Sequence, residues 1–293
     1  MTAALIVAAV MVRILANSLA NVFQKKLIGK VENAFLINAA VYALLSLGLL
    51  PWALFQSLNE LPAAFWLWAA AMGLCGACGN AFMVKALEHG ELSVLGPINA
   101  WKPVVGMVGG IFLLAELPSA GGMAGLALIV WGSSQVLGAD GDGFHWRILL
   151  RRDILFRVLA LLFTAVEAVF IKRVILLSSA ELAFLMWCWM GMAFSMVGAG
   201  SAGKTVVPAF RRLMNGRDVM LLLLLALCFG AMQFSTNVAF RLLPVGPALA
   251  LFQLSAVVNL WLGWRLFRET GMRRKIFGTA FTVAGAVLII LFP

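Results

Sequence analysis

The sequence predicts an all-α membrane protein with ten transmembrane helices, arranged as two inverted repeats of five helices each. Of its 293 residues, 63% are hydrophobic and 12% are charged, whereas a soluble domain carries roughly 25% charged residues. Mean hydropathy is +1.01, and the apolar stretches reach the roughly 20 residues that a helix needs to cross a bilayer. Stretches such as 219–229 and 276–292 do not alternate between apolar and polar residues, as the strands of a membrane barrel would.

The expected helices fall into two groups of five. Those of the first half cover residues 3–23, 33–55, 64–87, 93–115 and 120–138, and those of the second half cover residues 154–176, 181–200, 218–242, 246–267 and 274–292. Between the groups lies ADGDGFHWRILLRRD, the most polar stretch of the chain. We therefore expect a first repeat at residues 1–138, a polar linker at 139–153 and a second repeat at 154–293.

Short motifs recur in register in the two halves. The first expected helix closes with VFQKK (22–26) and the sixth with VFIKR (169–173), while the second and seventh open with ENAFL (32–36) and ELAFL (181–185). One constant offset also relates Glu116, Gly125 and Gly132 to Glu269, Gly278 and Gly285. Because five helices cross the membrane an odd number of times, the second repeat must enter from the opposite side, an arrangement typical of secondary transporters.

Residues 85–132, KALEHGELSVLGPINAWKPVVGMVGGIFLLAELPSAGGMAGLALIVWG, resemble the EamA family of the drug/metabolite transporter (DMT) superfamily, and the resemblance extends over nearly the whole chain. That family's repeat has a proline in its fourth helix, an acidic residue after it and glycines in the fifth. The matching residues are Pro103, Glu116, Gly125 and Gly132 in the first half and Glu269, Gly278 and Gly285 in the second. Ala256 stands where the second proline is expected, a departure from the pattern. The resemblance implies a ten-helix carrier whose path is lined by the first, third and fourth helices of each repeat.

Two short motifs resemble sites of other protein classes. Residues 198–205, GAGSAGKT, match the phosphate-binding loop pattern, but that loop works between a strand and a helix, and here it follows an expected membrane helix. We interpret it as a small-residue helix end and a basic loop. Cys75 and Cys78 resemble half of a metal or redox motif, yet no second pair follows. With Gly73, Gly76 and Gly79 around them, they predict close packing of the third helix. We expect no metal ion and no cofactor.

Charged residues deep inside expected helices are the most informative for function. Arg13, Lys102 and Glu167 lie near the middle of the first, fourth and sixth helices, where a charge costs roughly 2.5–3.5 kcal/mol on insertion scales. Such residues face a cavity or pair with one another. Glu116 and Glu269 lie at helix ends, where we expect a structural charge at the membrane interface instead.

Polar residues at helical spacing predict that the buried charges share a cavity. Arg13, Asn17 and Asn21 recur every four residues and therefore lie on one face of the first helix, and Gln233, Asn237 and Arg241 do the same on the eighth. The expected substrate-binding residues are Arg13, Asn17, Asn80, Asn99, Trp101, Lys102, Gln233, Asn237, Gln253 and Asn259. Glu167 is expected to be the proton-coupling carboxylate or the counter-ion of Arg13 or Lys102.

These residues favour a secondary transporter that exports a small anionic or zwitterionic metabolite, such as an amino acid or a derivative. Two buried cations against one carboxylate favour a negatively charged group, because Arg and Lys are the usual partners of carboxylate and phosphate. Export is the direction that the family resemblance suggests. Proton-coupled efflux of cationic drugs through Glu167 is one alternative, and a flippase for a lipid-linked phosphate is another. A membrane enzyme is disfavoured because no nucleophile stands with a base.

The remaining expectations concern location and partners. Basic residues in the loops fall almost entirely on one side, which includes Lys25, Lys85 and Arg157, whereas the other side has only Lys172, Arg173 and Arg241. Because Lys and Arg stay cytoplasmic, we expect both termini on the non-cytoplasmic side, most naturally of a bacterial inner membrane, although relatives are expected to have them inside. The expected partners are a small-molecule substrate, membrane lipids and protons, with no nucleic acid despite the net charge of +10, in a monomer or homodimer.

Overall fold

The chain folds as a bundle of α-helices. A computed structural model describes residues 2–28, 33–90, 98–99, 101–102, 105, 119–137, 151–201 and 216–292. Within these residues the regular elements are ten α-helices and one 3-10 turn, with no strand. They are α1 (Thr2–Ile28), α2 (Ala34–Ala53), η1 (Leu58–Glu60), α3 (Ala63–His89), α6 (Ala120–Leu137), α7 (Arg152–Leu177), α8 (Ala180–Ser201), α10 (Gly216–Leu242), α11 (Val245–Phe252), α12 (Ser255–Phe267) and α13 (Met272–Leu291).

Seven stretches of the described chain are long and apolar enough to cross a membrane. They are Ala4–Ile28, Ala34–Ala53, Ala63–Glu88, Arg152–Leu177, Ala180–Gly200, Asp218–Leu242 and Ala248–Phe267. The expected class, an all-α membrane protein, is thereby confirmed. The expected fourth helix at 93–115, which contains Pro103, lies almost wholly outside the described residues, as do Glu116 after it and most of the expected linker at 139–153.

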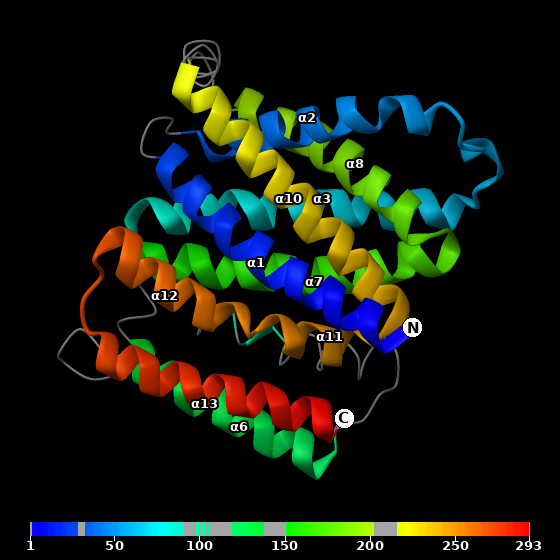
Figure 1. Ribbon diagram of the computed structural model, residues 1–293. Helices are drawn as coiled ribbons and strands as arrows, with labels where there is room; N and C mark the ends of the chain where they lie inside the picture. The colour runs from blue at the N-terminus through cyan, green and yellow to red at the C-terminus, as the bar shows by residue number, and fades with distance from the viewer. Residues whose placement is uncertain are drawn as a thin grey trace.

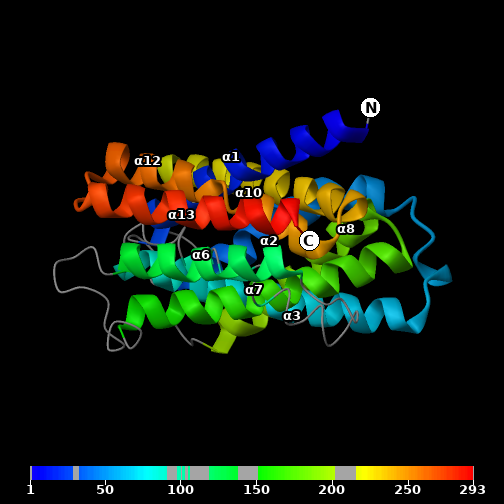
Figure 2. The same ribbon diagram turned by 90° about the horizontal axis from the view of Figure 1, so that it is seen from below.

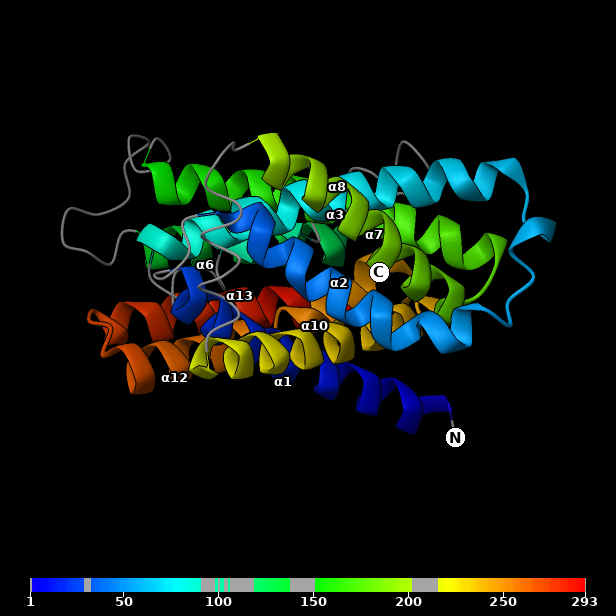
Figure 3. The same cartoon turned by 90° about the horizontal axis from the view of Figure 1, so that it is seen from above.

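Helices of the first half pack against helices of the second rather than among themselves. The closest pairs are α1 with α10, α3 with α7, α2 with α8 and α6 with α13. Figure 1 shows the helices lying side by side, with both chain ends at the same end of the bundle. Seen from below and from above, α1 and α10, α3 and α7, and α6 and α13 again lie next to each other (Figures 2 and 3). Any cavity in this bundle is therefore walled by both halves.

Helix α3 packs closely against α7 and α8. A β-carbon at Gly73 would lie 2.2 Å from Met190 Cβ, and one at Gly79 would lie 2.6 Å from Thr164 Cγ2. The glycines therefore let α7 and α8 approach α3 more closely than any side chain would allow. This confirms that the glycines around Cys75 and Cys78 serve helix packing.

The phosphate-loop pattern begins inside a helix. Gly198 belongs to α8, and a β-carbon there would lie 2.6 Å from the ring of Phe35 on α2. The small residue therefore serves the contact between α2 and α8, as the helix-end interpretation predicts. Residues 202–205 of the pattern lie outside the described residues.

The expected helix at 246–267 is wrong in one respect, because it is broken into α11 and α12 at Gln253 and Leu254. The side-chain Nε2 of Gln253 donates to the carbonyl of Leu249 at 3.0 Å. That carbonyl would accept the Gln253 backbone N–H in a continuous helix, but this N–H bonds Ala250 instead. A polar side chain thus replaces one backbone bond of the helix and locally tightens the turn.

The turn between α12 and α13 presents Glu269 to the end of α1. Arg268 takes the left-handed conformation with φ 52°, and the Glu269 N–H returns to the carbonyl of Gly263, a common way to end a helix. The carboxylate of Glu269 then pairs with Lys25 Nζ at 3.3 Å. Lys25 also donates to the carbonyl of Gly90 at the end of α3, so one ammonium group joins three helix ends.

Helices α6 and α13 form a closely packed pair at one edge of the bundle (Figure 1). A β-carbon at Gly285 would lie 2.4 Å from the backbone oxygen of Gly125, and one at Gly132 would lie 2.6 Å from that of Gly278. The four glycines that resemble the family pattern therefore meet at this one contact.

Replacing Gly285 by alanine should force the two helices apart. We expect Gly285→Ala to lower the free energy of unfolding by about 1–3 kcal/mol, the usual effect of overpacking. Gly48→Ala is the matched control, because nothing lies within 4 Å of a β-carbon there. Thermal unfolding of both variants in the same detergent measures the difference. Equal melting temperatures would contradict the close approach of α6 and α13.

Candidate functional site

A cavity with a volume of about 90 Å³ lies between the two halves of the bundle. It has room for several water molecules. The lining residues of the described chain are Arg13, Asn17, Asn21, Gln24, Asn80, Met83, Asn99, Lys102, Arg157, Ala160, Thr164, Glu167, Ala168, Ile171, Trp187, Phe229, Met232, Gln233, Thr236, Phe240, Leu249, Phe252, Gln253 and Ser255. The break between α11 and α12 falls at this wall, and discontinuous helices commonly mark the binding site of a transporter.

The guanidinium group of Arg13 is partly unsatisfied. It lies over the ring of Phe252, with 4.9 Å between Cζ and the ring centroid. Its Nε and Nη1 atoms are buried and have no hydrogen-bond partner among the residues that the structure describes. A buried donor without a partner is unfavourable, so a polar group that enters the cavity could satisfy these donors.

Glu167 is buried in the opposite wall, on α7. Its Oε1 accepts a hydrogen bond of 2.7 Å from the indole Nε1 of Trp187. A β-carbon at Gly76 would lie 2.4 Å from the same oxygen, so the glycine leaves the space that the carboxylate occupies. In the described part of the chain, no salt bridge joins Glu167 to Arg13 or Lys102. The carboxylate is therefore oriented by Trp187 rather than by a direct ion pair.

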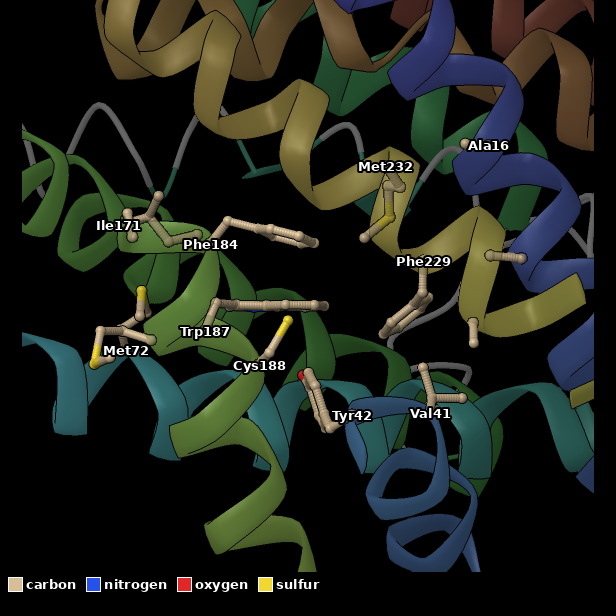
Figure 4. Packing of buried hydrophobic residues seen from close by; sticks show 14 of the residues in the cluster. Ala16, Val41, Tyr42, Met72, Ile171, Phe184, Trp187, Cys188, Phe229 and Met232 are labelled. Atoms are coloured by element: carbon tan, nitrogen blue, oxygen red, sulfur yellow. The ribbon is translucent and has the colours of Figure 1, made fainter. Parts of the chain in front are cut away.

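An aromatic cluster holds the Trp187 ring in place. Tyr42 of α2 meets it edge-on with 4.7 Å between ring centroids, and Phe184 stacks on it at 6.3 Å. Figure 4 shows the Trp187 ring between these two side chains. Asn80 Nδ2 donates to the Tyr42 hydroxyl at 2.8 Å. A chain of contacts thus runs from the cavity wall on α3 through α2 and α8 to Glu167 on α7.

The structure brings most of the expected site residues to one cavity. The lining includes Arg13, Asn17, Asn80, Asn99, Lys102, Gln233, Gln253 and Glu167.

Three expected residues are not part of this lining. Asn237 accepts a hydrogen bond of 2.9 Å from Gln233 and donates one of 3.0 Å to the carbonyl of Ala180, which fixes the start of α8. Asn259 is fully buried behind Asn21, with 3.5 Å between Asn21 Nδ2 and Asn259 Oδ1. Trp101 packs against an apolar cluster that contains Ile98.

Arg157 is the main residue that the sequence analysis placed differently. We expected it among the cytoplasmic basic residues, yet it lines the cavity and its exposed fraction is 2%. Arg157 follows Asp153 by one turn of α7. The lining residues Thr164 and Glu167 follow Arg157 by seven and ten residues, so these three side chains share one face of the helix. That periodicity was the available signal, but Arg157 lies too near the helix start for its burial to be evident.

The site combines basic, amide and aromatic groups that can bind a polar solute. Among the described residues, no group of three His, Cys, Asp or Glu side chains could hold a metal ion. The chain is thus an all-helical membrane protein with a polar cavity between its halves. The profile of the EamA-like transporter family matches residues 4–137. The first half of the chain is therefore similar to this family of DMT-type membrane transporters, which confirms the expected resemblance.

One solved structure shows the same fold over the whole chain. It is a crystal structure with 16% sequence identity and a TM-score of 0.68, and the match covers 97% of this chain and 96% of the other. At that identity the likeness concerns the fold alone. No curated protein matches the chain.

Removing the indole donor should destabilise Glu167. Trp187→Phe keeps a ring beside Tyr42 and Phe184 but deletes the hydrogen bond to the buried carboxylate. We expect the free energy of unfolding to fall by about 1–3 kcal/mol. Trp261→Phe is the control, because that side chain is exposed. If thermal unfolding in detergent affects both variants equally, the hydrogen bond does not stabilise the fold.

Proposed function

We propose that the protein is a secondary transporter that exports a small anionic or zwitterionic metabolite, such as an amino acid or a derivative. The observation that carries this proposal is the position of Arg13 and Lys102 in one polar cavity between the halves. The donors of Arg13 that lack a partner in the described chain would supply a site for the negative group of the substrate. The helices on both sides of the cavity come from different halves, so a relative movement of the halves would open it to either side.

We propose further that the ten transmembrane helices expected from the sequence form two inverted repeats. The helix pairs support this arrangement, because exchanging each first-half helix with its counterpart leaves the set of pairs unchanged. Helices α1 and α7, the first of each half, start at opposite ends of the bundle (Figure 1). Lys25 of α1 donates to the carbonyl of Gly90, and its counterpart Lys172 of α7 donates to that of Leu243.

The cavity lining gives the strongest support for the repeats. Val22 and Val169 occupy corresponding positions in the two halves, and the same spacing in sequence relates four lining residues of α1 to four lining residues of α7. Gly125 and Gly278 also correspond, and their spacing relates four lining residues of the third and fourth helices to four lining residues in the second half. The paired positions are Arg13 and Ala160, Asn17 and Thr164, Asn21 and Ala168, Gln24 and Ile171, Asn80 and Gln233, Met83 and Thr236, Asn99 and Phe252, and Lys102 and Ser255.

Proton-coupled efflux of a cation is the second candidate. It has one observation in its favour, since Glu167 lies beside Trp187 and Phe229, which offer aromatic faces for a cation. The basic residues of the same cavity oppose it, because a cation would enter against their charge. In both candidates Glu167 is the proposed proton-coupling carboxylate.

Transport of labelled amino acids and organic anions into liposomes tests the leading proposal. Arg13→Ala and Lys102→Ala should each weaken substrate binding by about 30-fold or more, since deleting one partner of a buried charge pair costs roughly 2–5 kcal/mol. Lys26→Ala is the matched control, because Lys26 is exposed on α1. Full transport by both cavity variants would remove the basis of the proposal. A pH gradient across the same liposomes tests coupling, which Glu167→Gln should abolish.

We propose a bacterial inner membrane, with both termini on the non-cytoplasmic side. The two chain ends lie at one end of the bundle (Figure 1), which fits an even number of spans. Basic residues gather in the described turns at the other end, which include Lys25 and Lys26 of α1, Arg151 and Arg152 at the start of α7, and Arg273 and Arg274 at the start of α13. Lys and Arg remain in the cytoplasm during insertion.

A reporter that is active only in the cytoplasm, fused to Pro293, should therefore be inactive. The same reporter inserted in the segment between α6 and α7 should be active. Strong activity at Pro293 would show that the orientation is the reverse.

A further inference from the structure

We infer that Lys25 and Glu269 form a gate that closes the transport path at the end of the bundle where α1 terminates. This inference rests on the proposed transport function, because it assigns the end at which the solute enters or leaves the cavity. Opening the gate breaks the contact between the two side chains and parts the adjoining ends of α1, α3 and α12.

A polar face of α1 leads from the cavity towards this end. Four residues of α1 line the cavity at spacings of four, four and three residues, which place them on one helix face: Arg13, Asn17, Asn21 and Gln24. Gln24 is buried, with an exposed fraction of 1%. Lys25 lies one turn beyond Asn21, on the same side of the helix. The polar lining of α1 therefore continues to Lys25.

An apolar layer lies between the cavity and the gate. Its buried members are Val22 of α1, Leu87 of α3 and Leu262 of α12, which form a cluster distinct from the main core cluster of the bundle. Met83, which lines the cavity, packs against this small cluster. Because few apolar side chains of the described chain meet here, parting them costs less free energy than opening the main core.

The contacts of Lys25 close the outer side of this layer. Its Nζ lies 3.3 Å from Glu269 Oε1 and 3.1 Å from the carbonyl oxygen of Gly90. The same ammonium stands over the ring of Phe267, with 4.5 Å to the ring centroid, and Phe267 packs against the small apolar cluster. One cation therefore joins the ends of α1, α3 and α12 just beyond the apolar layer.

The same order of layers recurs along the neighbouring helices. On α3, the cavity residue Met83 is followed one turn later by Leu87 of the apolar cluster and then by Gly90, which binds Lys25. On α12, Leu262 of the cluster likewise precedes Glu269. A cavity, an apolar layer and a polar contact stacked along three helices are the arrangement of a closed gate.

The gate can open and close again because water reaches one partner while the other is fixed. The side chain of Lys25 is 19% exposed and that of Glu269 is 4% exposed. A β-carbon at Gly263 would lie 2.6 Å from Glu269 Oε2, so the glycine leaves the space in which the carboxylate is held. The ammonium can therefore move into water and return to a carboxylate that stays in place.

The second half has a related contact at the other end of the bundle. Lys172 of α7, the counterpart of Lys25, donates to the carbonyl of Leu243. Leu243 corresponds to Gly90 at the spacing that relates Gly125 to Gly278. Alternating access requires a closure at each end of the path, and these related contacts at the two ends fit that requirement.

Modification of a cysteine placed beside the gate tests the inference. Gln24→Cys puts a thiol at a cavity-lining position next to Lys25. A small water-soluble thiol reagent is added to the purified protein in detergent, and peptide mass spectrometry measures the rate of modification at residue 24. The rate follows the fraction of molecules in which the gate is open.

Breaking the contact should accelerate this modification. Adding Lys25→Met or Glu269→Gln should raise the rate about tenfold or more, because a hydrogen bond to a charged group stabilises the closed state by about that factor. The two changes together should raise it by less than the product of the single effects, because both remove the same contact. Lys25→Arg should keep the slow rate. Lys26→Met is the matched control, because it removes the same charge from the exposed neighbouring position and should leave the rate unchanged.

Cys188 distinguishes opening of the gate from general loosening of the bundle. Its side chain is completely buried in the main core cluster, so its modification requires wider unfolding. Faster modification at residue 24 with an unchanged rate at Cys188 supports the gate. A parallel rise at both positions would overturn it. If Lys25→Met does not fold, Glu269→Gln decides.

The assay uses no transported solute, so its failure is distinguishable from failure of the proposed function. A rate at residue 24 that does not depend on Lys25 or Glu269 would overturn the gate, while transport is judged by the liposome assay with the Arg13 and Lys102 variants. If the contact controls the rate but the liposome assay detects no transport, the proposed function fails and the opening at this end stands.

Discussion

One hydrogen bond positions the acidic side of the cavity, namely the bond from the Trp187 indole to the buried carboxylate of Glu167. A charge in this place is tolerable only with a donor beside it, and the donor in turn needs a fixed ring. Tyr42 and Phe184 fix that ring, and Gly76 leaves room for the carboxylate. Four helices, α2, α3, α7 and α8, therefore meet around a single polar contact. Apolar packing in the rest of the bundle could not fix the relative positions of these helices alone.

The opposite wall has the reverse property, because the guanidinium group of Arg13 is incompletely satisfied within the described chain. Arg13 has a ring face but lacks partners for two of its donors in the described chain. A fully satisfied site would be rigid, whereas an unsatisfied one gains free energy when a solute supplies the missing acceptors. The basic end of the bundle is by contrast well paired, since Lys25 binds Glu269 and Gly90 together. Lys25 at the end of the bundle therefore has its hydrogen-bond partners, whereas Arg13 in the central cavity has donors without a partner in the described chain.

Most of the fold was predictable from the sequence, because lipid allows few alternatives to long apolar helices. The expected bounds of α1, α3 and α7 differ from the observed ones by a few residues. The break between α11 and α12 was not predictable, since it depends on the side chain of Gln253 replacing a backbone donor. Arg157 and Asn237 show the corresponding limit for the site. Periodicity assigns a residue to a helix face but does not say whether the neighbouring helix leaves a cavity there or a carbonyl to bind, as Ala180 does for Asn237.

The paired lining positions place different side chains on corresponding helix faces of the two halves. The same face of α1 and of α7 reaches the cavity, yet α1 supplies Arg13 and Asn17 where α7 supplies Ala160 and Thr164. Equivalent positions of the two helices thus reach the cavity, while the chemistry at these positions differs. If the halves are inverted repeats, as proposed, such equivalence would let them exchange conformations at similar free energy, which alternating access requires. Under the proposed function, this difference in side chains would favour one orientation of the solute, because its negative group would meet Arg13 on α1 but only Ala160 at the counterpart position on α7.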